Sequence, residues 1–287
     1  MEHLEVLKTY KIYIGGNFPR TESGRFYKVY DSEKELLANA CLCSRKDVRD
    51  AVKIARGAFG GWKSRSAYNR GQILYRIAEM MESRRAEFES QLSKIGFTSA
   101  EATADVNASI DRLIYYAGWT DKYQQIFGSV NPVASAHFNF SLLDPTGVVG
   151  IFAPEASPLL GLVSLVAPVI AGGNTCVALA SEAYPLPAII FAEVLNSSDV
   201  PGGVVNILTG KKEELAEHFS AHKDVNAMIY TDNLSNEMKK MIDENASTSV
   251  KRIVKKLVND WYEDDTQSPY FITDFQETKT TWHPVGF

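Results

Sequence analysis

Three cysteines are the side chains in this sequence that could supply a nucleophilic thiolate or bind a metal. Cys176 lies in the middle of an apolar run, so we predict a core position for it rather than a reactive thiolate. Cys41 and Cys43 share one face of a predicted strand, but no histidine or further cysteine lies nearby. The cysteines therefore predict no catalytic residue and no metal site, and a reducing, cytoplasmic setting is the default.

The segment 145–210 shows the clearest alternation of predicted strands and helices. We expect these elements to position any ligand-binding groups. Apolar, β-rich runs at 147–152, 175–179 and 204–208 alternate with apolar helical stretches at 158–170 and 185–195. Continuous apolar strands separated by helices predict an α/β fold with a parallel sheet covered on both faces. Each strand ends in a small or turn-forming residue, where an open sheet of this kind forms its ligand crevice.

The N-terminal part of the chain predicts short strands followed by three helices. Ser44 and Asp47 form a capping box that begins a helix over 47–59, which the pair Gly60-Gly61 should end. Apolar stripes predict further helices over 66–94 and 100–125.

Length and charge limit the classes of function. The chain has 287 residues, of which 45% are hydrophobic, enough for one large domain with appendages. A formal net charge of -5 gives no electrostatic reason to expect nucleic acid or an anionic membrane as a partner. The N-terminus shows no apolar signal region, and the longest apolar segment, 158–172, is too short to span a bilayer comfortably.

Two alternating segments lie on either side of the sheet region, one at 135–143 and one at 270–284. They predict two strands that pair as an antiparallel arm. Such an arm cannot bury both of its faces alone, so we expect it to dock on another chain or module. Its exposed Phe271, Phe275 and Trp282 would otherwise favour aggregation.

With these residues in view, the sequence resembles the aldehyde dehydrogenase superfamily over residues 10–256 and again in the C-terminal strand. The resemblance implies that the sheet belongs to an NAD-binding Rossmann-like domain and that the two long strands form an oligomerisation arm. It rests on motifs in family order: Tyr13-Ile-Gly-Gly, Ala58-Phe-Gly-Gly-Trp62, Arg70-Gly-Gln-Ile-Leu, Pro145-Thr-Gly-Val-Val-Gly, Ala171-Gly-Gly-Asn-Thr, Pro201-Gly-Gly-Val-Val-Asn and His222-Lys-Asp-Val.

Several positions depart from the family pattern. Ala156 stands where the family has the Asn that holds the oxyanion, and loss of one such donor typically costs about a hundredfold in rate. Glu182 keeps a carboxylate that can hydrogen-bond a ribose hydroxyl, but Leu179 replaces the cationic residue beside it. Asp232 would place a negative charge at a helix N-terminus that faces the pyrophosphate, unless it only caps that helix.

The resemblance also implies that the catalytic domain, with its nucleophilic cysteine and general base, is missing. The sequence passes from the last sheet strand through a short polar linker to the arm. The domains predicted in this way are 1–127 with 145–257 as the Rossmann-like domain, 128–144 with 268–287 as the arm, and 258–267 as the linker.

This pattern is similar to the degenerate, non-catalytic module of the two-module (family-sixteen type) aldehyde dehydrogenases. The leading hypothesis is a structural or regulatory module that pairs through its β-arm with itself, as a homo-oligomer, or with a complete aldehyde dehydrogenase. The alternative is an NAD-binding oxidoreductase component whose partner chain supplies the nucleophile. Vestigial contacts to NAD, weakened or lost, would come from Phe152, Pro154 and Glu182. An excised module, a stand-alone split protein and a decayed enzyme stay open.

Overall fold

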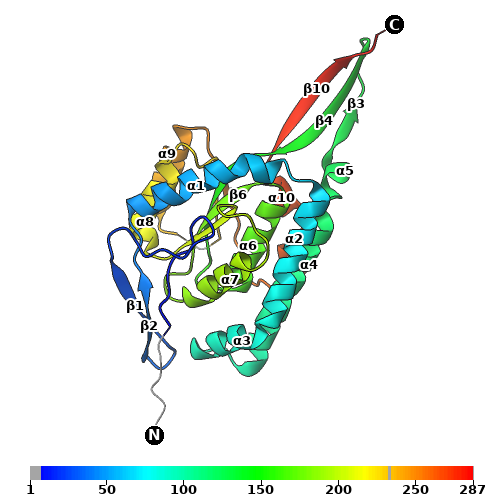
Figure 1. The fold of residues 1–287 in the computed structure, drawn as a ribbon. Helices are drawn as coiled ribbons and strands as arrows, with labels where there is room; N and C mark the ends of the chain where they lie inside the picture. Colours follow the sequence, from blue (N-terminus) through cyan, green and yellow to red (C-terminus); the bar gives the residue numbers. More distant parts are fainter. Residues whose placement is uncertain (1–7, 232–233, 287) are drawn as a thin grey trace.

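The computed structural model describes residues 8–231 and 234–286 and shows helices on both sides of a parallel sheet, with a long β arm projecting from one end (Figure 1). Its strands are β1 (Phe26–Tyr30), β2 (Leu36–Cys41), β3 (Ser129–Asn131), β4 (His137–Pro145), β5 (Val148–Phe152), β6 (Thr175–Leu179), β7 (Val205–Leu208), β8 (Ala227–Tyr230), β9 (Arg252–Lys255) and β10 (Gln276–Pro284). Its helices are α1 (Arg45–Lys63), α2 (Ala67–Ser83), α3 (Arg85–Lys94), α4 (Ser99–Trp119), α5 (Tyr123–Phe127), α6 (Leu160–Ala171), α7 (Leu186–Asn196), α8 (Lys212–Ala221), α9 (Asn236–Ser247), a 3-10 turn η1 (Asp264–Thr266) and α10 (Tyr270–Thr273).

The central sheet has the strand order β7-β6-β5-β8-β9, and every neighbouring pair is parallel. All residues of strands β5 to β8 are buried. Alternate side chains enter two separate cores, so that Val149 and Ile151 face one layer of helices while Val148 and Phe152 face the other. The α/β fold with a parallel sheet buried on both faces, predicted from the apolar runs, is confirmed.

Two layers of helices cover the sheet (Figure 1). Helices α1, α8 and α9 pack on one face, whereas α6 and α7 pack on the other and are themselves covered by α2 and α4. Within the described residues, no helix is long and apolar enough to cross a membrane.

Helix α1 begins two residues before the predicted range 47–59, and it differs more at its other end. The capping box of Ser44 and Asp47 is present and begins the helix as expected. The helix does not end at Gly60-Gly61 but continues to Lys63, because Trp62 is anchored in the core, where its indole Nε1 donates a hydrogen bond to the Ile170 carbonyl at 3.0 Å. Burial of one tryptophan outweighs the low helix propensity of two glycines.

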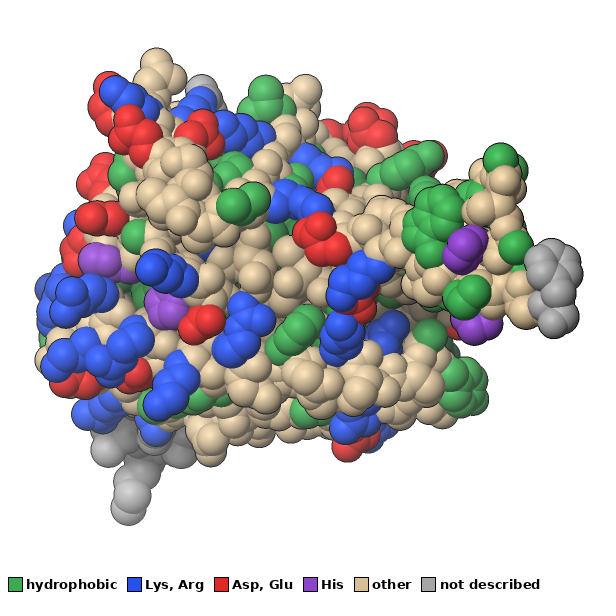
Figure 2. Space-filling view, turned by 90° about the horizontal axis from the view of Figure 1, so that it is seen from above, with side chains coloured by type: hydrophobic (Ala, Val, Ile, Leu, Met, Phe, Trp, Pro, Cys, Tyr) green, Lys and Arg blue, Asp and Glu red, His purple; other side chains and the backbone are tan. Residues whose placement is uncertain are grey.

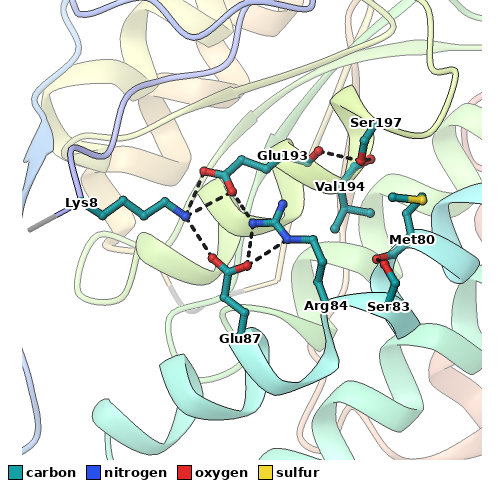
Figure 3. Close-up of polar contacts among 8 residues, drawn as sticks. All are labelled: Lys8, Met80, Ser83, Arg84, Glu87, Glu193, Val194 and Ser197. Carbon is teal, nitrogen blue, oxygen red and sulfur yellow. Dashed lines mark hydrogen bonds and ion pairs between the residues drawn. The ribbon is translucent and has the colours of Figure 1, made fainter. Parts of the chain in front are cut away.

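The single helix predicted over 66–94 is wrong, because Arg84 interrupts it with φ −109° and ψ 15°. The bend redirects α3, so that Phe88 and Leu92 are completely buried in the core. Figure 3 shows the charges at this bend: the Arg84 guanidinium contacts Glu87 and Glu193, and the Lys8 ammonium lies 3.0 Å from each of the same two carboxylates. This four-residue network joins the N-terminal segment, the bend and helix α7.

The helix predicted over 100–125 is also two helices. Helix α4 ends at Trp119, where the Thr120 hydroxyl donates a 2.9 Å hydrogen bond back to the Ala117 carbonyl. A threonine hydroxyl that bonds locally in this way competes with the continuing helical pattern. A short turn follows, and α5 begins at Tyr123.

The arm is a sheet with the strand order β10-β4-β3, in which β10 pairs with β4 along its whole length, from Gln276 opposite Pro145 to Pro284 opposite His137 (Figure 1). The predicted antiparallel pairing of these two distant segments is therefore present. The strand predicted from residue 270 is wrong over its first part, because α10 occupies Tyr270–Thr273. Phe271 and Phe275 are buried rather than exposed, whereas Trp282 is 58% exposed.

Candidate functional site

A cleft of about 710 Å³ opens at the carboxyl ends of strands β5 and β6. Its walls come from Tyr27 on the β1–β2 hairpin, Glu182 in the turn after β6, Lys212 at the start of α8, and Met238 at the start of α9. This is the edge at which open α/β sheets bind their ligands. The structure thus forms a cleft where the strand endings of the sequence predicted one.

Glu155, in the turn after β5, contacts the segments that follow β6 and β7 at this edge of the sheet. Its Oε2 accepts hydrogen bonds from the Ser181 hydroxyl at 2.6 Å and from the Ala183 N–H at 3.2 Å. Its Oε1 accepts from the Glu182 N–H at 3.2 Å and lies 2.8 Å from the Lys212 ammonium. The carboxylate therefore links the turn after β6 to the first residue of α8, which follows β7.

The surroundings of Glu155 keep it ionised. Partial burial alone would raise the pKa of this carboxyl group, but the Lys212 ammonium, the Ser181 hydroxyl and the Glu182 N–H together outweigh burial and hold the pKa below its usual value. At neutral pH the group is a carboxylate that only accepts hydrogen bonds.

The three residues predicted to touch NAD lie in different environments. Glu182 is partly exposed and lines the cleft. Phe152 is 1% exposed and packs edge-on against Phe219, with 5.3 Å between the ring centres. Pro154 is buried against Gly161, where an added Cβ would lie only 2.3 Å from the proline ring. The structure places Glu182 beside the open cleft, and a role of all three residues in cofactor contact stays a prediction.

Glu155 and Lys212 are the site residues that the sequence analysis missed. The sequence carries a signal for them, since an acid follows one predicted strand and a lysine follows another. In parallel strands of one sheet such residues lie on the same edge. Asp232, the other charge considered at this edge, lies outside the described residues.

No accessible thiol lies near the cleft, because Cys41, Cys43 and Cys176 are all buried. Burial raises the pKa of Cys43 and of Cys176 well above the ordinary thiol value. Ala156, by contrast, is exposed. Over the described ranges, no group of three His, Cys, Asp or Glu side chains is arranged to hold a metal ion.

The segment 256–275 between β9 and β10 is held against helix α4. The Arg112 guanidinium, which is buried, donates to the Thr266 carbonyl and, at 2.8 Å, to the Trp261 carbonyl. The Tyr116 hydroxyl donates to the Ser268 carbonyl at 3.2 Å. Trp261 itself is 7% exposed, so the segment predicted as a polar linker carries a core residue.

Asp105 of α4 joins this segment to the start of helix α6. It accepts a 3.3 Å hydrogen bond from the Leu160 N–H and a 3.4 Å hydrogen bond from the Tyr262 hydroxyl. Asp105 is 2% exposed, and burial raises the pKa of its carboxyl group to about 6, against the opposing effect of these two hydrogen bonds.

The aldehyde dehydrogenase family model matches residues 18–257 of this chain. The chain belongs to the aldehyde dehydrogenase family. It is 32% identical over 255 residues to aldehyde dehydrogenase, cytosolic 1, of Elephantulus edwardii, covering 86% of this chain and 50% of that protein. It is 33% identical over 259 residues to human cytosolic 10-formyltetrahydrofolate dehydrogenase, covering 86% of this chain and 28% of that protein. The chain thus spans about half, or less, of the length of these relatives.

Solved structures give the same assignment. The NAD+ complex of an aldehyde dehydrogenase from Bacillus cereus superimposes with a TM-score of 0.82 at 28% identity, covering 87% of this chain and 51% of that chain. PnpE in complex with nicotinamide adenine dinucleotide matches with the same TM-score, identity and coverage. The fold described above is therefore the NAD-binding-type fold of the aldehyde dehydrogenase family.

Proposed function

We propose that this chain is a non-catalytic structural or regulatory module of the aldehyde dehydrogenase family, which pairs through its arm with a second copy or with a complete aldehyde dehydrogenase. One observation carries the proposal. Only residues 256–275 connect the last strand of the parallel sheet to the arm, and they are folded against α4 through Arg112 and Tyr116. No catalytic domain interrupts the chain at this point.

The side chains of the sheet region support the same proposal. Covalent oxidation of an aldehyde needs an accessible thiolate, and all three cysteines are buried. A tetrahedral intermediate also needs a donor for its oxyanion, and the Ala156 side chain has none. We therefore expect no dehydrogenase turnover by this chain alone.

The arm supports an assembly role, because it projects from the rest of the molecule (Figure 1) and carries exposed apolar side chains (Figure 2). Strand β10 forms one edge of the arm sheet, and an unpaired edge can accept a strand from another chain. The exposed apolar residues of the arm are Val130, Phe138, Leu142, Trp282 and Val285.

The absence of a catalytic segment between β9 and the arm is also the reason to liken the chain to the non-catalytic module of two-module aldehyde dehydrogenases. On this proposal the module supplies an interface rather than a reaction. Its binding of NAD is weakened or lost.

The test is the mass of the native complex. We expect the tagged wild-type chain, purified from its own lysate, to form a complex of fixed stoichiometry with itself or with a complete aldehyde dehydrogenase. Trp282→Asp should abolish this complex, because it places a charge on the exposed arm. Phe26→Asp changes an aromatic residue of comparable exposure, 62%, on strand β1, which lies at the end of the molecule away from the arm (Figure 1), and it should leave the complex intact. A monomeric wild-type chain, or equal effects of both substitutions, would contradict the proposal.

A second candidate function is NAD binding in support of a partner that supplies the nucleophile. It is favoured by the position of Glu182 at the cleft and by the NAD+ complexes of the solved relatives. Calorimetric titration with millimolar NAD+ tests it, and absence of a binding signal would eliminate it.

A further inference from the structure

The Glu155 carboxylate occupies the hydrogen-bond donors that an anionic ligand would need at the cleft. Consecutive backbone N–H groups in a turn bind anions, as does the N-terminus of a helix. Here the N–H groups of Glu182 and Ala183 both point at Glu155, at 3.2 Å each, and the Ser181 hydroxyl adds a third donor at 2.6 Å. A carboxylate of the chain itself therefore occupies the donors of this anion-binding turn.

The same carboxylate engages the cation at this edge. The Lys212 ammonium lies 2.8 Å from Glu155, and the Lys212 side chain is only 10% exposed. The Glu155 side chain is 38% exposed, so the lysine is the buried member of this ion pair, and removing the carboxylate from a largely buried ammonium is costly. A phosphate entering here would have to displace Glu155 from both the turn and the lysine.

The remaining charges of the cleft act in the same direction. Among the described residues, the walls carry four acidic side chains and two lysines: Asp31, Glu155, Glu182 and Glu213 against Lys28 and Lys212. A phosphate-bearing ligand would thus meet a cleft whose donors are occupied and whose lining is net negative.

We infer that Glu155 is an internal anion that determines the specificity of the cleft, by excluding ligands that carry a phosphate group. The inference deepens the proposed function and rests on its weakened binding of NAD, for which Glu155 supplies the cause. The Glu155 carboxylate binds the donors of the turn and the Lys212 ammonium, as a ligand phosphate could. The turn and helix α8 are therefore linked without a bound nucleotide.

The experiment compares three ligands on four forms of the full chain. AMP, NAD+ and adenosine are titrated by calorimetry into the wild type and into Glu155→Gln, Glu155→Ala and Glu213→Gln. The Gln substitution removes the charge and keeps the shape. Glu213 lines the same cleft at the start of α8, so its substitution controls for the loss of one negative charge that does not contact the turn. Thermal unfolding of each variant shows that it is folded, and the Ala variant provides a second measurement if Gln keeps its hydrogen bonds too well.

We expect Glu155→Gln to raise the affinity for AMP and NAD+ by about tenfold or more, the change that corresponds to loss of one charge repulsion in a wet site. The affinity for adenosine, which has no phosphate, should stay unchanged, and Glu213→Gln should raise the affinity for AMP and NAD+ clearly less than Glu155→Gln does, because Glu213 does not occupy the donors of the turn. Unchanged AMP binding in both folded Glu155 variants would overturn the inference. An equal gain for adenosine would also overturn it, because the effect would then be steric.

These results are distinguishable from failure of the proposed function. A wild-type chain that binds NAD+ as tightly as Glu155→Gln refutes both the weakened binding and the role of Glu155. If the wild type shows no binding of AMP or NAD+ and the Glu155 variants show none either, only the role of Glu155 is refuted. The arm-dependent complex is measured separately and is affected by neither result.

Discussion

Replacement of Asp105 by asparagine should stabilise the protein at neutral and alkaline pH. Asp105 of α4 is buried, and among the described residues only the Leu160 N–H and the Tyr262 hydroxyl donate hydrogen bonds to its carboxylate and so offset burial of the charge. Asparagine has nearly the same shape and is neutral. Its side-chain oxygen can still accept from the Leu160 N–H, and its amide can donate to the Tyr262 oxygen.

The magnitude follows from the pKa. The pKa of Asp105 is about 6 in the folded protein, compared with an ordinary value of 3.8, a difference of 2.2. At about 1.4 kcal/mol for each unit of pKa, ionisation of Asp105 costs the folded state about 3 kcal/mol, as an order of magnitude. The folded state binds the proton more tightly, so the unfolding free energy decreases as pH rises from 3.8 to about 6, and the full cost is present above pH 6.

Urea unfolding at several pH values measures this effect. Relative to the wild type, Asp105→Asn should gain up to about 3 kcal/mol of unfolding free energy at pH 8, and this gain should be smaller by about 1.4 kcal/mol at pH 5. Asp111→Asn, at an exposed position of the same helix, is the matched control and should show no such trend. A difference between Asp105→Asn and the wild type that does not vary with pH would refute the reasoning.

Two further predictions concern the linker and the lost chemistry. Arg112→Met should destabilise the chain by about 2 kcal/mol, because it leaves the Thr266 carbonyl without its donor and removes one of the two donors to the Trp261 carbonyl. It should also speed proteolysis within 256–268. Unfolding monitored by tryptophan fluorescence checks this, and an unchanged midpoint would contradict it. Ala156→Asn restores a possible oxyanion donor. It should still give no NADH from an aliphatic aldehyde and NAD+, because Cys176 remains buried. NADH absorbance above that of the wild type would disprove this.

The sheet could be predicted from the sequence because its signal is local. The strand predicted over 175–179 coincides with β6, and the two flanking strands differ from their predictions by one residue at the start. A run of one threonine and four apolar residues between two apolar helices leaves few alternatives to a buried parallel strand. The helix ends could not be predicted equally well, since tertiary contacts determine them: the Trp62 indole bond to Ile170 carries α1 past two glycines, and Arg84 bends the next helix toward Glu193.

The residues 270–275 illustrate an ambiguity that no local pattern resolves. Phe271 and Phe275 have the even spacing of one face of a strand, but they are also four residues apart, which is the spacing of one face of a helix. The structure forms the helix α10 over Tyr270–Thr273, and the rings of Phe271, in this helix, and of Phe275, two residues after its end, both enter the core. Glu155 and Lys212 were missed for a different reason, because 57 residues separate them and only the order of the strands brings them together.

The turn after β5 is held by the chain's own residues at both of its ends. At residue 155 the carboxylate binds the turn after β6 and the start of α8. At residue 160 the backbone N–H is bound by Asp105, which in turn holds Tyr262 of the segment leading to the arm. Both contacts occupy polar groups at the carboxyl edge of the sheet, where a ligand of an open α/β fold would otherwise bind. Such internal pairing stabilises the edge without a ligand, and it explains how a sheet of the NAD-binding type can persist in a chain whose proposed role is assembly rather than catalysis.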